Sequence, residues 1–236
     1  MEPFKFKLFT IQQDKCAMKV GTDGVLLGAW VSLHTLPNSI LDIGTGTGII
    51  ALQLAQRSKA EIIDAIEIDN NAFEQAVENF ENSPWNDRIF CYHVSLEEFT
   101  NEIDQKYDLI ISNPPFYNDE FESNNEARNK ARFTSSLSFE NLLVSVSKLL
   151  SGTGTFATII PYKEEANFIK MAEQYQLKIN KICRVQGNKN TEIKRSLLAF
   201  SKDQNKIEVR QLIIEKERHQ YTDAYQNLVK GFYLKM

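Results

Sequence analysis

The regular alternation of short apolar segments with amphipathic ones between residues 39 and 161 constrains the fold more than any other feature. The apolar segments have the length and residue types of buried strands, and the segments between them have helical periodicity. Such alternation predicts an α/β fold, with a mostly parallel sheet and helices on both faces. The predicted strands are 39–44, 61–69, 88–95, 107–112 and 152–161, and the predicted helices are 48–58, 70–83 and 138–150.

The carboxyl-terminal part of the chain has a different pattern. Two strand-like segments, 177–187 and 195–202, are separated by a short polar stretch, which predicts an antiparallel addition at the edge of the sheet. We expect residues 206–215 to form a further strand or an extended segment. The polar run 117–136 is the one long loop, and loops of this length are usually functional or disordered.

Composition excludes several classes of protein. No run approaches the roughly 18 apolar residues of a membrane span, and the N-terminal stretch lacks the apolar core of a signal peptide. We therefore expect a cytoplasmic protein without a membrane partner. Its three cysteines and three histidines are far apart in the sequence, so we expect no metal site and no disulfide framework.

Charge is distributed unevenly along the chain. Residues 1–127 hold 8 Lys and Arg against 21 Asp and Glu, hence −13, whereas residues 128–236 hold 19 against 10, hence +9. The two parts together give the net charge of −4. Such asymmetry favours a nucleic-acid-binding face on an otherwise acidic protein, although basic solvated helix faces would give the same count.

A glycine-rich turn joins the first predicted strand to the first predicted helix. Gly44, Gly46 and Gly48 stand at alternate positions, where glycine lets a ligand approach the backbone and the helix offers free N–H groups. This pattern is typical of a nucleotide site. The dinucleotide fingerprint G-x-G-x-x-G needs glycine at position 49, which is Ile49, and this counts against a nicotinamide cofactor.

Glu67 closes the second predicted strand, 19 residues after Gly48. A carboxylate there can accept hydrogen bonds from both hydroxyls of a ribose. Asp69 is better suited to cap the helix that follows.

The stretch Asn113-Pro114-Pro115-Phe116 ends the fourth predicted strand. The prolines stop the strand and fix the backbone. The Asn113 amide oxygen and the Pro114 carbonyl can both accept hydrogen bonds from one planar NH₂ group, which makes its lone pair available for attack. Phe116 can stack on the ring that carries the amine.

These residues resemble the motifs of class I S-adenosylmethionine-dependent methyltransferases: Asp42-x-Gly44-x-Gly46-x-Gly48, then Glu67, then Asn-Pro-Pro-Phe. The resemblance implies a Rossmann-like fold with a seven-stranded, mostly parallel sheet and an antiparallel carboxyl-terminal edge. It implies S-adenosylmethionine as cofactor, with the glycines near its methionine part, Glu67 on its ribose, and Ser95 and Leu96 near its adenine. It also implies that Asp42 and Ile68 belong to the cofactor-binding residues. Many members carry an acidic residue where Ser95 stands here.

Three further stretches resemble the bacterial tRNA1(Val) adenine-37 N6-methyltransferases: 20–30, 131–143 and 221–236. The resemblance implies an adenine of tRNA as substrate, a base that can be splayed from its loop and stacked on Phe116. Thr22 and Asp23 either touch the cofactor or cap the helix that they begin. We expect no obligate protein partner. The candidate phosphate contacts are Arg128, Lys130, Arg132, Lys189, Lys194 and Arg195.

We accordingly expect one methyltransferase domain over 1–236, made of an N-terminal segment and helix (1–38), a Rossmann-like core (39–202) and a C-terminal extension (203–236). Alternatives remain on the residues alone. A ribosomal-RNA guanine-N2 methyltransferase shares Asn-Pro-Pro-Phe, a glutamine methyltransferase has a similar motif with tyrosine, and a non-catalytic RNA-binding protein could keep the fold.

Overall fold

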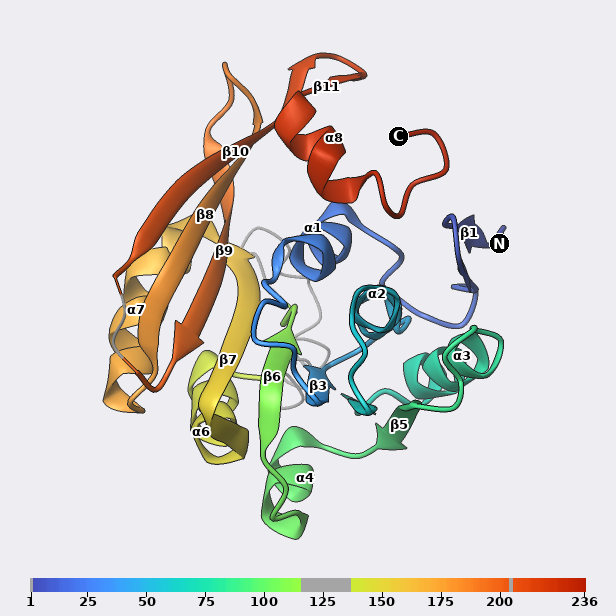
Figure 1. Cartoon of the computed structure of the whole chain (residues 1–236), viewed down its shortest axis with the longest axis vertical. Coiled ribbons are helices and arrows are strands. Elements are labelled where there is room, and N and C mark those ends of the chain that lie inside the picture. The colour runs from blue at the N-terminus through green and yellow to red at the C-terminus, as the bar shows by residue number, and fades with distance from the viewer. Residues whose placement is uncertain (1, 116–136, 204–205) are drawn as a thin grey trace, which may run out of the picture.

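The computed structural model describes residues 2–115, 137–203 and 206–236. Nine strands of this part form one sheet in the order β11-β10-β8-β9-β7-β6-β3-β4-β5 (Figure 1). Five parallel strands make its centre and one side: β3 (Ser39–Ile43), β4 (Ile62–Glu67), β5 (Ile89–His93), β6 (Tyr107–Ser112) and β7 (Leu150–Pro161). The α/β fold and the predicted strands are thereby confirmed.

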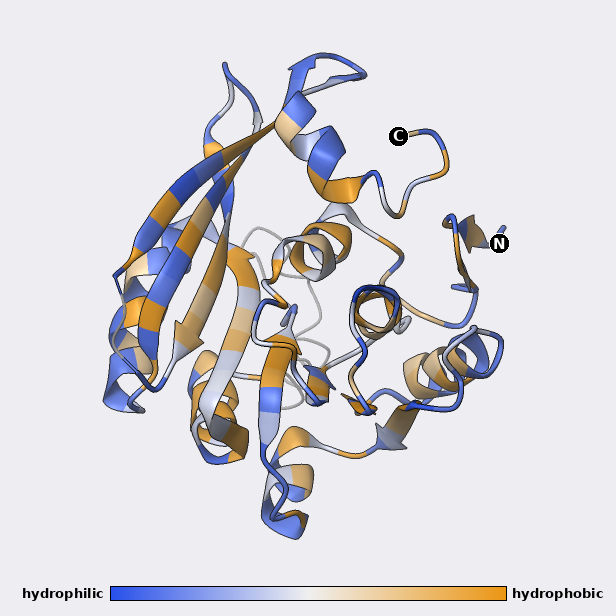
Figure 2. Ribbon diagram, viewed as in Figure 1, coloured by the Kyte–Doolittle hydropathy of each residue, from blue (hydrophilic) through white to orange (hydrophobic). Residues whose placement is uncertain are grey.

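The antiparallel pair predicted for the carboxyl-terminal part is also present. β9 (Ile193–Ser201) runs antiparallel to β7 and to β8 (Lys178–Asn188). The further strand expected over 206–215 is confirmed as β10 (Glu208–Glu217), which pairs in parallel with β8. The short β11 (Gln220–Tyr221) closes the edge, so the described sheet has two strands more than the seven that the resemblance implies. Figure 2 shows why β10 joins: β8 and β10 carry alternating hydrophilic and hydrophobic bands, the period of a strand with one buried face.

Helices cover both faces of the sheet, as the alternation predicts. One face is covered by α1 (Thr22–Trp30), α2 (Ile49–Arg57), α3 (Asn70–Glu81) and α8 (Asp223–Val229), and the other by α4 (Leu96–Glu102), α6 (Phe139–Leu149) and α7 (Glu165–Gln174). Successive strand residues therefore enter different clusters, Ile40 the first and Leu41 the second. None of the described helices has both the length and the apolar composition to cross a bilayer.

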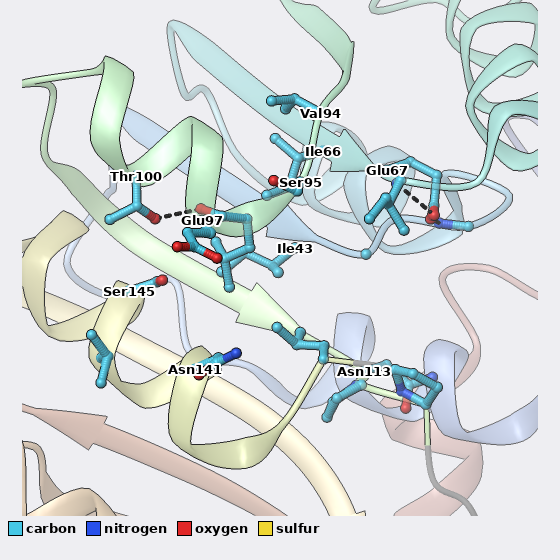
Figure 3. Close-up of a pocket in the computed structure, with 18 of the residues that line it drawn as sticks. Ile43, Ile66, Glu67, Val94, Ser95, Glu97, Thr100, Asn113, Asn141 and Ser145 are labelled. Carbon is cyan, nitrogen blue, oxygen red and sulfur yellow. Dashed lines mark hydrogen bonds between the residues drawn. The ribbon is translucent and has the colours of Figure 1, made fainter. Parts of the chain in front are cut away.

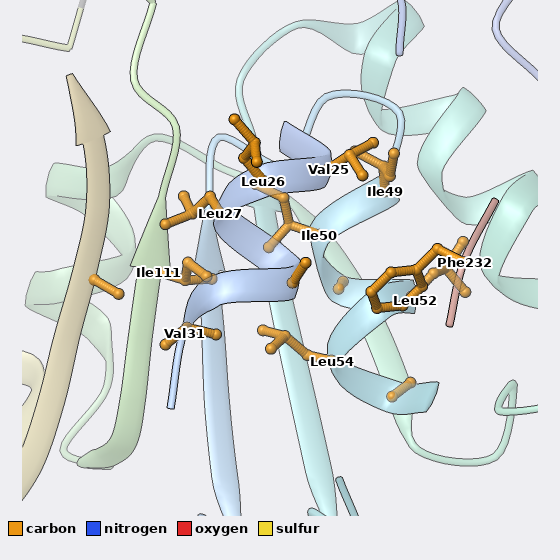
Figure 4. Close-up of a cluster of buried hydrophobic side chains, with 14 of the residues drawn as sticks. Val25, Leu26, Leu27, Val31, Ile49, Ile50, Leu52, Leu54, Ile111 and Phe232 are labelled. Carbon is orange, nitrogen blue, oxygen red and sulfur yellow. The ribbon is translucent and has the colours of Figure 1, made fainter. Parts of the chain in front are cut away.

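Helix α1 packs on α2, with apolar side chains filling the space between them and the sheet (Figure 4). Arg57 at the end of α2 donates to the carbonyls of Gly28 (2.6 Å) and Val31 (2.9 Å), which satisfies the carbonyls that the end of α1 leaves open. The predicted cap is confirmed at α3, where Asp69 accepts from the Ala72 N–H, and Ser138 caps α6 in the same way by accepting from the Asn141 N–H.

The N-terminal segment packs on the other end of the chain. A hairpin of β1 (Phe4–Lys5) and β2 (Thr10–Ile11) stacks Phe6 on Phe9 and near Tyr233. The Lys7 ammonium donates to the carbonyls of Lys230 and Met236, at 2.6 and 2.8 Å. This hairpin has no strong sequence signal, because each strand has only two residues.

Gly48 is required by packing at the start of α2. Its φ is +81°, in the left-handed region that disfavours other residues, and a Cβ added there would lie 2.4 Å from the Phe80 ring of α3. We predict that Gly48→Ala lowers the free energy of unfolding by about 2–4 kcal/mol, the sum of backbone strain and overpacking. Urea denaturation measures the change. Gly152→Ala, where an added Cβ meets nothing within 4 Å, is the control, and equal losses in the two variants would contradict the assignment.

Candidate active site

A cavity of about 490 Å³ lies at the carboxyl ends of β3, β4 and β6. The order of the strands reverses between β3 and β6, and ligands of open α/β sheets bind at such a crevice. The lining comes from the loops after these strands and from α4 and α6 (Figure 3). Of the predicted site residues, the cavity brings together Gly44, Gly46, Glu67, Ile68, Ser95, Leu96, Asn113, Pro114 and Pro115.

The glycine loop presents its backbone to this cavity. Gly44 and Gly46 have φ of +70° and +57°, and a Cβ added to either would meet no protein atom within 4 Å. The loop is tied to β4, since the N–H groups of Gly44 and Thr45 both donate to the Ile66 carbonyl, at 3.0 and 3.1 Å. The open space beside both glycines leaves room for a ligand against the main chain.

Glu67 lines the same cavity and is hydrogen-bonded to the glycine loop. Its Oε2 accepts from the Gly46 N–H at 2.9 Å, and its Oε1 accepts from the N–H groups of Ile68 and Asp69, both at 2.9 Å. A carboxylate offers about four lone-pair directions. Three are used, so Glu67 retains about one toward the cavity that it lines.

Asp42 is placed differently from the prediction. It is fully buried and is not among the residues that line the cavity. Its Oδ2 accepts from the Thr45 hydroxyl at 2.6 Å and from the Ala51 N–H at 3.2 Å, so Asp42 ties the glycine loop to α2. Its Oδ1 has no hydrogen-bond partner within the described chain. Burial, the largest cause, raises the pKa of Asp42 to about 7, and the Glu67 charge adds to the rise.

Three more predicted cofactor residues lie outside the lining. Gly48 is turned toward Phe80, as described above. Thr22 and Asp23 are in the first turn of α1, but the N-cap residue is Gly21 and no side chain caps the helix. The Asp23 carboxylate instead pairs with the Arg195 guanidinium at 2.8 Å. The spacing of these residues in the sequence predicts that they lie near the cavity. It does not predict which way each of them faces.

Ser95 and Leu96 line the cavity at the start of α4. The Ser95 hydroxyl accepts from the Glu98 N–H at 3.2 Å, so this side chain caps the helix. Ile68 reaches the cavity mouth with a largely exposed side chain. Asn113, Pro114 and Pro115 form the wall that follows β6, with Asn113 half-buried across the cavity from Glu67 (Figure 3). Phe116 lies outside the described residues.

The predicted phosphate contacts divide into two groups. Lys189 is exposed at the turn between β8 and β9, and Lys194 is exposed near the start of β9, where Arg195 follows with its link to Asp23. Arg128, Lys130 and Arg132 lie outside the described residues.

Sequence reasoning missed a second wall of the cavity, built from two helices. Asn141, Ser145 and Lys148 of α6 and Glu97 and Thr100 of α4 line it. The signal was available, because polar residues at intervals of three and four form one stripe of a helix. Met18 also lines the mouth. Its segment is held by Asn79 of α3, which donates to the carbonyls of Gln12 and Thr47, at 2.9 and 2.8 Å.

The sheet order, the glycine loop bonded to an acidic strand end, and the Asn-Pro-Pro wall define a class I S-adenosylmethionine-dependent methyltransferase. Comparisons with known proteins agree. Residues 22–136 match the family model of the methyltransferase small domain. On 234 residues, 99% of this chain and 100% of the relative, the chain is 56% identical to a tRNA1(Val) (adenine(37)-N6)-methyltransferase of Flavobacterium johnsoniae. A relative of the same name from Christiangramia forsetii is 54% identical over 100% of this chain and 99% of its own. The chain belongs to this family of tRNA1(Val) (adenine(37)-N6)-methyltransferases, which confirms the resemblance inferred from its motifs.

Solved structures show the same fold at low identity. A predicted O-methyltransferase from Agrobacterium tumefaciens superposes with a TM-score of 0.69 at 19% identity, covering 89% of this chain and 96% of its own. A ribosomal-protein methylase from Lactobacillus delbrueckii gives a TM-score of 0.55 at 19% identity, covering 77% of each chain.

The raised pKa of Asp42 has a consequence for stability. The native state binds this proton more tightly than the unfolded chain, where the carboxyl pKa is about 3.9. The stabilisation from the neutral acid is thus complete below about pH 4 and is lost as the pH rises toward 7, by a few kcal/mol. We predict that Asp42→Asn, which is always neutral, gains stability relative to the unchanged protein between pH 4.5 and 7.5. Urea unfolding at both pH values gives the difference, and a difference that is independent of pH would contradict the buried acid.

Proposed function

We propose that this protein transfers a methyl group from S-adenosylmethionine to the exocyclic N6 of an adenine in tRNA, adenine 37 of tRNA1(Val). The observation that carries the proposal is the identity of 54–56% with relatives of that name over practically the whole of both chains. A tRNA substrate also supports the expected cytoplasmic location.

The cavity suits the cofactor in its residues as well as in its volume. The open backbone at Gly44 and Gly46 would hold the methionine part. The remaining lone pair of Glu67 would accept one ribose hydroxyl, and Ile68, Ser95 and Leu96 would enclose the adenine. When bound, the cofactor supplies a methyl group made electrophilic by a sulfonium charge. Asp42 and Gly48 would contribute by shaping the loop from behind.

Asn113 would position the amine that attacks. The amide oxygen and the Pro114 carbonyl would each accept a hydrogen bond from one N–H of the amine, which favours a tetrahedral nitrogen with its lone pair directed into the cavity. The prolines lack N–H groups and hold this backbone rigid. Positioning of this kind supplies a large part of the rate of a bimolecular transfer. Phe116 is predicted to stack on the adenine, and it lies outside the described residues.

The direct test is transfer of radiolabelled methyl from S-adenosylmethionine to bulk tRNA from a strain that lacks this protein, followed by mass spectrometry of the nucleosides. We expect labelled N6-methyladenosine in valine tRNA. Labelled N2-methylguanosine would favour the guanine alternative. Binding of tRNA without any transfer would favour a non-catalytic RNA-binding protein.

We predict that Asn113→Ala lowers kcat by on the order of 10²–10³, the range found when one preorganised polar contact is removed from an active site. Cofactor affinity should stay within a few-fold, because Asn113 contacts the amine. Single-turnover transfer and calorimetric titration with S-adenosylmethionine measure the two quantities. Asn141→Ala removes another amide from the same cavity and should leave kcat within a few-fold. A large loss of cofactor affinity in Asn113→Ala would remove the assigned role.

Glu67→Ala should show the reverse pattern, with cofactor affinity falling first, on the order of tenfold or more. The substitution removes a ribose contact and also leaves the N–H groups of Gly46, Ile68 and Asp69 without their acceptor. Calorimetric titration measures the dissociation constant. Glu98→Ala, an exposed carboxylate one residue beyond the lining, is the matched control. Equal affinities in the two variants would contradict the ribose assignment.

A further inference from the structure

An exposed tyrosine stands beside the active-site strand. Tyr162 follows directly on the carboxyl end of β7 and begins a short 3-10 helix, η2 (Tyr162–Glu164). Its side chain is 38% exposed. No motif of the sequence assigns a role to Tyr162. It does not line the cavity, and the proposed transfer does not require it.

A guanidinium lies over this ring and is itself held in place. Arg184 of β8 has its guanidinium carbon 5.5 Å from the Tyr162 ring centroid, within the range of cation–π contacts. Its Nη2 and Nε donate to Oε1 of Glu165 at 2.7 and 3.1 Å. Glu165 is buried at the start of α7 and also accepts from the Ser196 hydroxyl of β9. Contacts from β8, β9 and α7 therefore hold the guanidinium over the Tyr162 ring of η2.

The pair lies close to the catalytic wall. Ser112 of β6 is in register with Thr158 of β7, so Asn113 lies beside Ile159, three residues before Tyr162. At about 3.3 Å per residue, Tyr162 is roughly 10 Å farther along the sheet. This distance corresponds to about three nucleotides at the 3.4 Å spacing of stacked bases, and to fewer nucleotides in a strand whose bases are splayed apart.

The surroundings carry the charge expected of an RNA surface. Lys163 is exposed next to Tyr162, Lys189 is exposed at the β8–β9 turn, and Lys194 is exposed near the start of β9. β8 runs parallel to β7, so this turn projects from the same edge of the sheet (Figure 1). The acidic neighbours in sequence are Glu164, Glu165 and Glu192. Glu165 is buried and paired with Arg184, so the three exposed lysines outnumber the other two.

We propose that Tyr162, backed by Arg184, is a stacking platform for an unpaired RNA base that neighbours the methylated adenine. The proposal rests on the proposed function. Aromatic rings and guanidinium planes stack on unpaired bases with little regard to base identity. Contacts with phosphates, by contrast, do not distinguish a splayed base from a stacked one. A fixed platform would hold the loop open on one side of the adenine and so direct that base toward Asn113.

The test uses an anticodon stem-loop of valine tRNA with the fluorescent base 2-aminopurine on one side or the other of the target adenine. We expect the full-length protein to quench one of the two probes. Tyr162→Ala should abolish this quenching and weaken RNA binding by on the order of tenfold. Tyr162→Phe should keep both properties. Phe90→Ala removes an aromatic that is 43% exposed at the opposite edge strand, β5, and should change neither.

Two comparisons make the outcome specific. Arg184→Lys keeps the charge but loses the planar fork, so quenching should fall between the unchanged protein and Tyr162→Ala, with unchanged cofactor affinity. An abasic nucleotide at the quenched position should make Tyr162→Ala and the unchanged protein bind equally. Quenching or affinity unchanged in Tyr162→Ala, or its defect persisting on abasic RNA, would overturn the platform. Failure of the unchanged protein to methylate tRNA would instead overturn the proposed function.

Discussion

The hydrogen bonds of the Glu67 carboxylate hold two loops in one arrangement. One oxygen fixes the glycine loop after β3 through the Gly46 N–H, and the other fixes the turn after β4 through the N–H groups of Ile68 and Asp69. Glu67 ends β4, which is paired on both sides, with β3 and with β5, so the sheet fixes the position of this link. The distance across the cavity to the Asn113 wall then follows from the spacing of β4, β3 and β6.

Asp42 supports the same loop from the protein interior. It binds the Thr45 hydroxyl and the first turn of α2, whereas Glu67 binds the loop from the cavity side. Asp42 thus stabilises the shape of the loop, whereas Glu67 is also placed to contact the ligand.

Sequence reasoning was most reliable where periodicity or backbone chemistry decided the structure. The alternation between 39 and 161 predicted the sheet and its helices, and Glu67 and Asn113 were placed at the cavity because parallel strands end at one edge. It was less reliable for side-chain direction. Asp42 and Gly48 share the motif with Gly44 and Gly46, yet one points into the core and the other faces Phe80.

Contacts between residues that are far apart in the sequence could not be predicted either. Asp23 and Arg195 are 172 residues apart, and the sequence predicted a cofactor contact or a helix cap for the first and a phosphate contact for the second, not their ion pair. The parallel pairing of β10 with β8 required a tertiary neighbour that no local pattern names. The helix wall of α4 and α6, by contrast, was readable as polar stripes.

The hairpin at residues 4–11 gives the molecule a definite order of completion. Its lysine binds carbonyls 223 and 229 residues later, and Phe6 bridges to Tyr233. During synthesis the contacts of Lys7 and Phe6 can form only after the last helix has left the ribosome, whereas Gln12 can already bind Asn79 of α3 when the first half of the chain has been made. The segment that carries Met18 follows Gln12 directly, so its attachment to α3 can precede the attachment of the hairpin to the C-terminal residues. The Met18 side of the cofactor cavity can therefore form before the two ends of the chain join.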